Sequence, residues 1–597
     1  MTANALRSIK IKFAFWTLAT SSLTLVASHG GGLSIDLSCQ PRMSTELILS
    51  TIGDAISLND HLHDVSIDLS FSELGDSGIE AFVTSLSQFR EGLTVALTTR
   101  MNRITPMGTA RVLKRILGDE LNGVNETSKE MMGHLGGHTF ALRSLDLSWN
   151  NLHHEEPGAK TMMMDLRKLI ENPDRCPEIL QLNRCSLGPA ACRSIGKGIM
   201  NRCSGDKSDS KPLSLHLCGN PNVGDAGAAA LAAAIRGSSS DVTIFSTLDL
   251  SACGIGDAGA EALALALESH PGCIETLILS NNVISNSGAS SVSRGIVDSK
   301  TPIERLELDN NPGIGNVGAT ALADALGKGC IRNLSLRSCE VKADGAKAFG
   351  ECLKTLAKQQ ATAQVSIDLS GNPLGMLKKK KKESLKNKAT ATTASYMNFI
   401  GKQIKSGLKD VGLDTVLGTA SVESDDDEEE RMGEGNGNGS SDEPTRCGAK
   451  AFASAIVLSE GELHHDQLEA TDSVHVKCML GLRHCFLDQG AGDALAATIV
   501  QAKERFGIDL EVDVTLNNVL EDDMVRALNG EDRDGLEDMV DRHMEVVEAI
   551  RVAEARASQA SEAAAARGRS WDDEMSDNDG SYFPDDYDNE DEEDTLY

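Results

Sequence analysis

The chain has 597 residues, of which 40% are hydrophobic and only 3% aromatic, and its formal net charge at pH 7 is −32. An acidic balance of this size does not fit a nucleic-acid-binding protein, whose charge is normally basic, so we expect no nucleic-acid partner. The runs 423–430 and 571–597 hold 20 of the acids, so the rest of the chain is only moderately acidic.

Residues 1–28 have the pattern of a secretory signal peptide. Three basic residues precede an apolar stretch over 13–27, and small residues follow at Ala27 and Ser28. The stretch is too short and too rich in Ser and Thr for a membrane span. We expect cleavage near residue 28 and a location in the secretory pathway or outside the cell. The alternatives are a frayed apolar cap or an organelle transit segment, with the cytoplasm or nucleus as the alternative location.

From residue 33 to about residue 530 one phrase recurs, Leu-x-Leu-x-x-(Asn/Cys), followed by a glycine and an alanine-rich helix. Its first leucine falls at 145, 180, 215, 248, 277, 306 and 334, a spacing of 28 to 35 residues. A unit of this length holds one short strand with alternating inward apolar residues and one helix with an apolar stripe. Such units bury their apolar faces only by stacking, so the sequence predicts a repeat solenoid. Glycines at 227, 259, 288, 318 and 345 are expected to allow close packing near the helix starts.

Weaker copies of the phrase extend the array at both ends. They begin near residues 33, 66 and 93 before the regular repeats, and the phrase recurs at 367, at 480 and, as a closing strand, at 512. The fold class that we predict is α/β, a horseshoe with an inner parallel sheet of about 13 strands and outer helices.

The last position of the phrase, called the ladder slot below, alternates between Asn and Cys. The chain turns inward there, and an Asn amide or, more weakly, a Cys thiol can pair buried backbone groups from repeat to repeat. The four cysteines are expected to be buried and structural. We predict a ladder of Asn150, Cys185, Asn220, Cys253, Asn282, Asn311, Cys339, Asn372 and Cys485.

An acid recurs between the two inward apolar residues of the phrase, on the side that faces the concave surface. Asp is disfavoured in strands, so its recurrence is unusual, although any exposed strand position tolerates an acid. We predict a concave face that prefers a basic ligand, through electrostatic complementarity. The residues are Asp36, Asp68, Asp146, Asp249, Glu307, Asp368 and Asp513.

One repeat carries an insertion at 376–446, between its strand and its helix. It contains five consecutive lysines at 378–382, helically spaced apolar residues over 395–418 and the acidic run 423–430. One interpretation is a solvated, disordered loop. The other is a basic segment that contacts acidic lipid, nucleic acid or a partner and is gated by the acidic run.

The chain ends in two further segments. Residues 531–568 are rich in Ala, Glu and Arg and predict a helical cap or linker after the last repeat. Residues 569–597 form an acidic tail that we expect to be disordered.

Motifs for catalysis or for metal and cofactor binding are lacking. The sequence has no Walker loop, zinc motif or nucleophile elbow. Histidines and acids gather at 61–64 and 152–158 without HExxH spacing, and surface loops explain them. We therefore predict no enzymatic activity, no cofactor and no metal.

The alternating Asn/Cys slot and the "GDAGAxAL" helix starts resemble the ribonuclease-inhibitor type of leucine-rich repeat. The resemblance covers about residues 33–530 without the insertion, and it implies a curved horseshoe. That family includes ribonuclease inhibitor, the Ran GTPase-activating proteins and the sensor regions of NOD-like receptors.

The fold does not choose among those functions. The function that we predict is a non-enzymatic scaffold or adaptor that holds a protein partner, with a preference for a basic one, on its concave face and one loop rim. The alternative is a GTPase-activating protein for a Ran-like small GTPase, because an acidic tail after such an array is similar to that group. The insertion and the apparent signal peptide depart from that group's pattern.

Overall fold

The computed structural model describes most of the repeat array. The described residues are 24–28, 32–39, 63–86, 93–118, 141–203, 211–238, 243–359, 363–375, 448–456, 476–517, 520–532 and 534–546, with 548, 552 and 555. The predicted insertion 376–446 and acidic tail 569–597 lie outside the described residues, as do residues 1–23.

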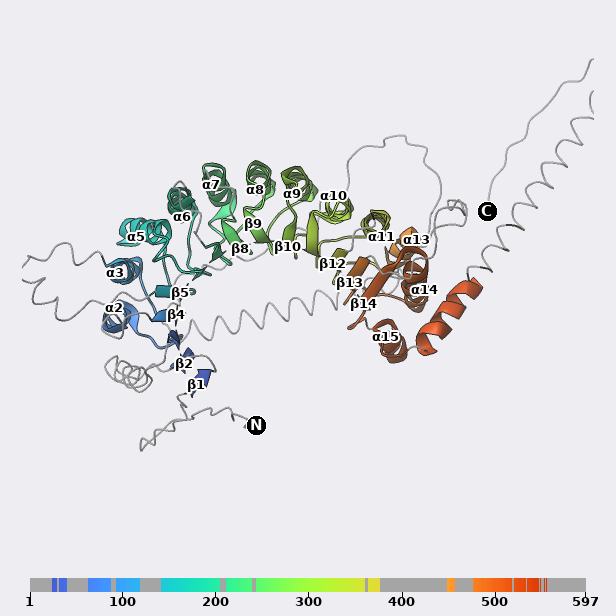
Figure 1. The fold of residues 1–597 in the computed structure, drawn as a ribbon, viewed down its shortest axis with the longest axis horizontal. Helices are drawn as coiled ribbons and strands as arrows, with labels where there is room; N and C mark the ends of the chain where they lie inside the picture. The colour runs from blue at the N-terminus through green and yellow to red at the C-terminus, as the bar shows by residue number, and fades with distance from the viewer. Residues whose placement is uncertain are drawn as a thin grey trace, which may run out of the picture.

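The strands of the described residues form a single sheet, ordered as in the sequence from β1 to β14. The 13 strands from β2 to β14 pair in parallel, as the sequence predicts, and the sheet follows the inside of an arc (Figure 1). They are β2 (Gly32–Asp36), β3 (Asp64–Asp68), β4 (Thr94–Thr98), β5 (Ala141–Asp146), β6 (Ile179–Gln181), β7 (Leu213–His216), β8 (Phe245–Asp249), β9 (Ile274–Ile278), β10 (Ile303–Glu307), β11 (Ile331–Ser335), β12 (Ala363–Asp368), β13 (Val476–Gly481) and β14 (Ile508–Asp513).

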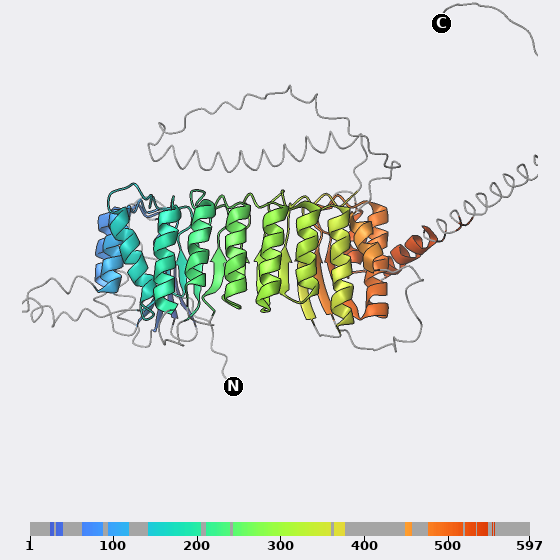
Figure 2. The ribbon, with the colours of Figure 1, turned by 90° about the horizontal axis from the view of Figure 1, so that it is seen from above.

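None of the described helices is long and apolar enough to cross a bilayer. The helices stand side by side on the outside of the sheet (Figure 2). They are α2 (Gly75–Leu86), α3 (Pro106–Leu117), α5 (Ala159–Glu171), α6 (Pro189–Cys203), α7 (Gly224–Arg236), α8 (Asp257–Ser269), α9 (Asn286–Ser299), α10 (Gly315–Gly327), α11 (Ala343–Lys358), α13 (Gly448–Ile456), α14 (Gln489–Phe506) and α15 (Asp522–Leu528).

The core lies between the sheet and the helices. In one repeat, Leu215 on strand β7, Leu217 just after it, and Leu231 and Ile235 on helix α7 are fully buried. Burial of each such side chain stabilises the fold by about 1.5–3 kcal/mol. The apolar periodicity of the phrase therefore accounts for the position of the core.

The ladder residues are buried where each strand turns toward its helix. The Asn220 amide donates to the carbonyls of Leu182 and Leu217 at 2.9 and 2.6 Å, and its oxygen accepts the N–H of Cys185 at 2.9 Å. The Cys253 thiol donates to the Leu217 carbonyl at 3.2 Å. All nine predicted ladder residues are buried, and Ser72, Asn102 and Asn517 occupy the same slot in other repeats.

Cysteine and asparagine use the slot differently. A thiol offers no acceptor as good as an amide oxygen. Where the slot holds Cys, the cysteine's backbone carbonyl accepts an N–H from the preceding repeat instead, as Cys253 does from Gly224 at 2.8 Å and Cys339 does from Gly315 at 3.0 Å. The alternation of Asn and Cys thus alternates two hydrogen-bonding patterns.

Both ends of the sheet carry additional structure. Strand β1 (Thr24–Ser28) pairs antiparallel with β2, and it lies within the predicted signal peptide. Cleavage after residue 28, which stays a prediction, would remove β1 and leave β2 as the edge strand. At the other end, residues 534–546 are helical, Met539 is buried, and Arg542 contacts the Asp493 carboxylate of α14 at 3.0 Å.

Candidate protein-binding surface

The seven predicted acids lie in one row across the inner, concave face of the sheet. The strand register places them on equivalent positions: Asp36 is opposite Asp68, and Asp249 is two strands away from Glu307. Their environments differ, because Asp36 is exposed whereas Asp146 is only 1% exposed.

Each aspartate of the row forms a hydrogen bond within its own repeat. Its Oδ1 accepts the N–H of the residue two positions later, at 2.9–3.1 Å, which closes an Asx-turn at the end of the strand. The local turn is a structural reason for the recurrence of Asp that the sequence analysis did not identify. The residues are Asp36, Asp68, Asp146, Asp249, Asp368 and Asp513.

Basic side chains pair with five of the seven acids. An Arg that follows one strand contacts the acid of the next strand in the pairs Arg100–Asp146 at 2.5 Å, Arg337–Asp368 at 3.7 Å and Arg483–Asp513 at 2.8 Å. The other two pairs are His216–Asp249 at 3.4 Å and Arg305–Glu307 at 3.3 Å. The concave acids therefore do not form one continuous unpaired row.

Unpaired acid remains at the N-terminal end of the concave face. No Lys, Arg or His of the described part of the chain pairs with Asp36, Asp64 or Asp68, and the first two are exposed. At Asp249, by contrast, burial acts to raise the pKa, but hydrogen bonds from His216 and Ser251 outweigh it and hold the pKa below its ordinary value. The acids of the row that lack a basic partner among the described residues are thus on β2 and β3.

The residue just before the ladder slot has a left-handed backbone in every described repeat, with φ between 50° and 74°. This conformation suits Gly and Asn and is unusual for bulky residues. In chain order the position holds Cys39, Phe71, Met101, Trp149, Arg184, Gly219, Ala252, Asn281, Asn310, Ser338, Gly371, His484 and Leu516.

Three consecutive repeats place a large apolar side chain at this position. Phe71 is 46% exposed, Trp149 is 44% exposed, and Met101 between them is half-buried. The Arg184 guanidinium lies 4.5 Å from the centre of the Trp149 ring. We call Phe71, Met101, Trp149 and Arg184 the rim stripe, because they follow one another along the loop rim after β3, β4, β5 and β6.

Gly219 allows Arg184 to reach Trp149. A Cβ atom at Gly219 would lie 2.6 Å from Cγ of Arg184, so the arginine stem passes over a position without a side chain. The rim stripe was not among the sites predicted from the sequence. The signal was a large apolar residue just before the slot in three consecutive repeats, in "LSFS", "TRMN" and "LSWN", whereas Leu516 is an isolated example at the far end of the array.

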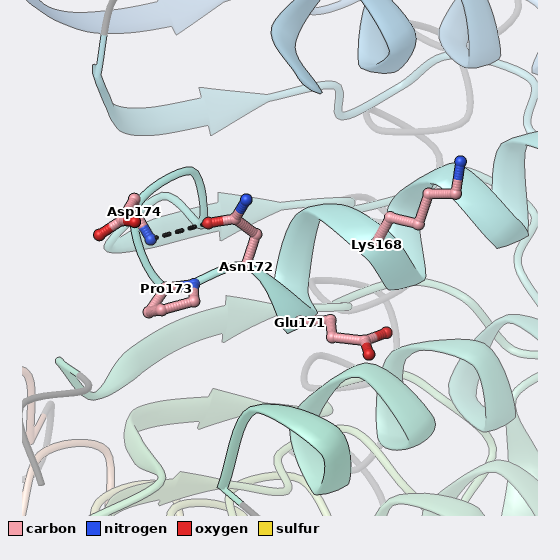
Figure 3. Close-up of a pocket in the computed structure, with 5 residues that line it drawn as sticks. All are labelled: Lys168, Glu171, Asn172, Pro173 and Asp174. Atoms are coloured by element: carbon pink, nitrogen blue, oxygen red, sulfur yellow. Dashed lines mark hydrogen bonds between the residues drawn. The ribbon is translucent and has the colours of Figure 1, made fainter. Parts of the chain in front are cut away.

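A hollow of about 430 Å³ lies on the opposite rim, where α5 ends before β6 begins (Figure 3). Lys168, Glu171, Asn172, Pro173 and Asp174 line it, and the Asn172 side chain accepts the N–H of Asp174 at 3.0 Å. It is open to solvent and its lining is polar. Among the described residues, no group of three His, Cys, Asp or Glu side chains is placed to hold a metal ion.

The 13 cysteines within the described ranges are free thiols. Burial raises the pKa of each predicted ladder thiol to about 12, namely Cys185, Cys253, Cys339 and Cys485. The sequence left local disulfides open for Cys176, Cys192 and Cys203, and none of the three is in a disulfide with a described residue. Cys176 instead accepts a hydrogen bond from the Arg202 guanidinium at 3.3 Å.

Comparison with known families supports the repeat assignment. Four segments, 65–83, 245–264, 273–293 and 299–323, match the family model described as a leucine-rich repeat. A comparison with curated proteins finds no match. The parallel sheet, the outer helices and these matches together give a leucine-rich repeat solenoid. Its finer assignment to the ribonuclease-inhibitor type stays a prediction.

Proposed function

We propose that this leucine-rich repeat solenoid is a non-enzymatic scaffold or adaptor that holds a protein partner against β2–β6 and the rim stripe. The observation that carries the proposal is the exposure of Phe71 and Trp149 in a left-handed conformation. Strained, exposed bulky residues gather at functional sites. Exposed Trp next to Arg is also typical of the residues that dominate binding energy in protein interfaces.

The surface is preorganised for binding. The rim stripe follows strands that are hydrogen-bonded to both neighbours, and the buried slot residues Asn102 and Asn150 fix the loops from below. A partner would therefore lose little free energy to ordering of the loops, which favours affinity. The unpaired acids Asp36, Asp64 and Asp68 support a basic partner.

Site-specific photo-crosslinking in the protein's own cells tests the proposal. We expect a photoreactive residue at Thr98 or Gln181, both on the concave face, to capture a discrete protein partner. The matched control is Glu261, which is exposed on the outer surface of α8. Capture of the same partner only from position 261, or of no partner from the concave positions, would contradict the proposal.

GTPase activation remains the alternative function. A single-turnover assay of GTP hydrolysis with Ran separates it from the scaffold role, because only an activator accelerates the reaction.

We also propose that the protein enters the secretory pathway, on the pattern of residues 1–28. The free thiols argue in the other direction, since thiols tend to pair in oxidising compartments. N-terminal sequencing of protein from its own cells decides: a mature start near His29 supports secretion, and an intact Met1 excludes cleavage.

A further inference from the structure

We infer that the rim stripe binds an amphipathic α-helix of the partner whose apolar side is flanked by Lys and Arg. This inference rests on the proposed function and deepens it. It follows from three properties of the stripe: the spacing of its side chains, the limits of its apolar surface and the charges beside it.

The spacing of the stripe is set by the sheet. The backbone hydrogen bonds of the sheet continue into the rim. The N–H of Phe71 donates to the carbonyl of Arg100 at 2.9 Å, that of Met101 to the carbonyl of Ser148 at 3.2 Å, and that of Trp149 to the carbonyl of Asn183 at 2.8 Å. Neighbouring strands are about 4.8 Å apart, so Phe71, Met101 and Trp149 recur at about that interval.

A helix matches this interval better than an extended segment does. Side chains at i, i+3 or i+4, and i+7 of a helix are about 5–6 Å apart. In an extended strand, side chains on one face are roughly 6.6 Å apart, and over two intervals they would be displaced from the stripe by more than about 3 Å.

The apolar surface is short and bounded. Arg184 covers part of Trp149 at one end, and Gly219 follows it with no side chain. At the other end the equivalent residue is Cys39, which is exposed. Three apolar contacts correspond to about two turns of helix.

Acidic groups lie near the two apolar ends of the stripe, close in sequence to Phe71 and to Trp149. Asp68 lies toward the concave face, and the exposed Glu155 and Glu156 lie in the loop after Trp149. Glu73 is already paired with Arg103 at 2.8 Å. Basic residues beside the apolar face of a bound helix would therefore be attracted by Asp68, Glu155 and Glu156, whereas acidic ones would be repelled.

Selection from a phage library of random 16-residue peptides against the full-length protein tests the inference. We expect the enriched peptides to carry apolar residues at i, i+3 or i+4, and i+7, with Lys or Arg beside them. Trp149→Asn should weaken their binding at least tenfold in fluorescence anisotropy. The matched control is Leu516→Asn, because Leu516 occupies the same left-handed position, with φ of 63° and 59% exposure, at the far end of the array. It should leave binding unchanged.

Other results would overturn the inference. These are no enrichment, peptides with apolar residues at i and i+2, or binding that Trp149→Asn does not affect. A dimer dissociated by Trp149→Asn would show that a second copy covers the stripe. Tighter binding of a synthetic 395–418 peptide than of any selected peptide would show that this chain's own segment does. If Thr98 still captures a partner in any of these cases, the scaffold function stands and only the helix assignment fails.

Discussion

Phe71 illustrates at the residue scale how binding and stability compete. Its left-handed backbone, with φ of 59°, suits Asn better than Phe. Phe71→Asn should leave the free energy of unfolding unchanged or raise it by up to about 1 kcal/mol, because relief of strain offsets the lost contacts of a half-exposed ring. Urea denaturation measures this.

The buried Phe82 is the control for that measurement, since Phe82→Asn should destabilise by more than about 3 kcal/mol. A loss of more than about 1 kcal/mol from Phe71→Asn would mean that the ring is part of the core instead of a binding residue.

Asparagine and cysteine in the ladder slot should contribute unequally to the free energy of unfolding. Asn220→Ala removes partners of the Leu182 and Leu217 carbonyls and of two N–H groups, at Cys185 and Leu187. We expect a loss of about 3 kcal/mol or more, against about 1 kcal/mol for Cys253→Ala, which removes one thiol donor. Equal losses in urea denaturation would contradict the hydrogen-bonding pattern described above.

The ladder thiols also predict a pH dependence of stability. Burial raises the pKa of Cys253 and of Cys339 from 9.0 to about 12, so the folded state keeps both thiols protonated. The unfolded chain loses these protons above its own lower pKa, so their contribution is complete below about pH 9 and falls as pH rises further. The urea midpoint should decrease above pH 9, and less steeply in Cys253→Ala/Cys339→Ala. An identical slope in that variant would exclude the thiols as the cause.

At the scale of elements, the acid at the start of α7 and the acid at the start of α8 each cap the next helix. Oδ1 of Asp225 accepts the N–H groups of Gly256 and Gly259 at 2.7 and 3.0 Å. Asp257 binds Ser285 and Gly288 in the same way. The "GDAG" motif therefore connects neighbouring repeats, beyond its local role in starting a helix.

Because of this connection, the effects of substitutions at Asp257 and at Gly288 on the free energy of unfolding should depend on each other. Asp257→Ala should destabilise by about 1–2 kcal/mol through the lost cap. Gly288→Ala should also destabilise, because its Cβ would lie 2.5 Å from Oδ1 of Asp257. In a double-mutant cycle the two effects should be less than additive, since Asp257→Ala removes the shortest of the contacts that the new Cβ would make, although the contact with Ile284 at 2.9 Å stays. Additive losses would show that the two residues act independently.

The repeats could be predicted from sequence because both their strands and their helices are local in sequence. The 13 parallel strands follow from the Leu-x-Leu phrase. Strand β1 could not be predicted, because its segment resembles a signal peptide and its antiparallel pairing has no copy elsewhere in the array.

The candidate site was less accessible to prediction. Arg100 and Asp146 are 46 residues apart, so their pairing depends on the stacking of repeats. The rim stripe depends on the sign of φ, which a Phe or Trp letter does not indicate. The concave acids were identified by position, whereas the Asx-turns and the paired arginines became visible only in the folded chain.

For the whole molecule, the order of strands in the sheet has a consequence for the insertion. Residues 369–475, which include the insertion 376–446, separate strands β12 and β13, yet the two strands pair in an unbroken register from Ala363↔Val476 to Asp368↔Gly481. The helices packed behind them, α11 and α13, are also adjacent. The long segment therefore begins and ends within one repeat of an otherwise continuous stack.

The interpretation of 376–446 as a solvated loop predicts, from loop-closure entropy, that the length of this segment is almost neutral for stability. The free energy of closing a flexible loop rises only by about 0.6 kcal/mol for each doubling of its length. Deletion of about half of 376–446 should therefore change the free energy of unfolding by less than about 1 kcal/mol, as judged by urea denaturation. A larger loss would mean that the segment is packed against the array. The solenoid can thus tolerate a segment of variable length and composition in this repeat while the geometry of the rim stripe stays unchanged.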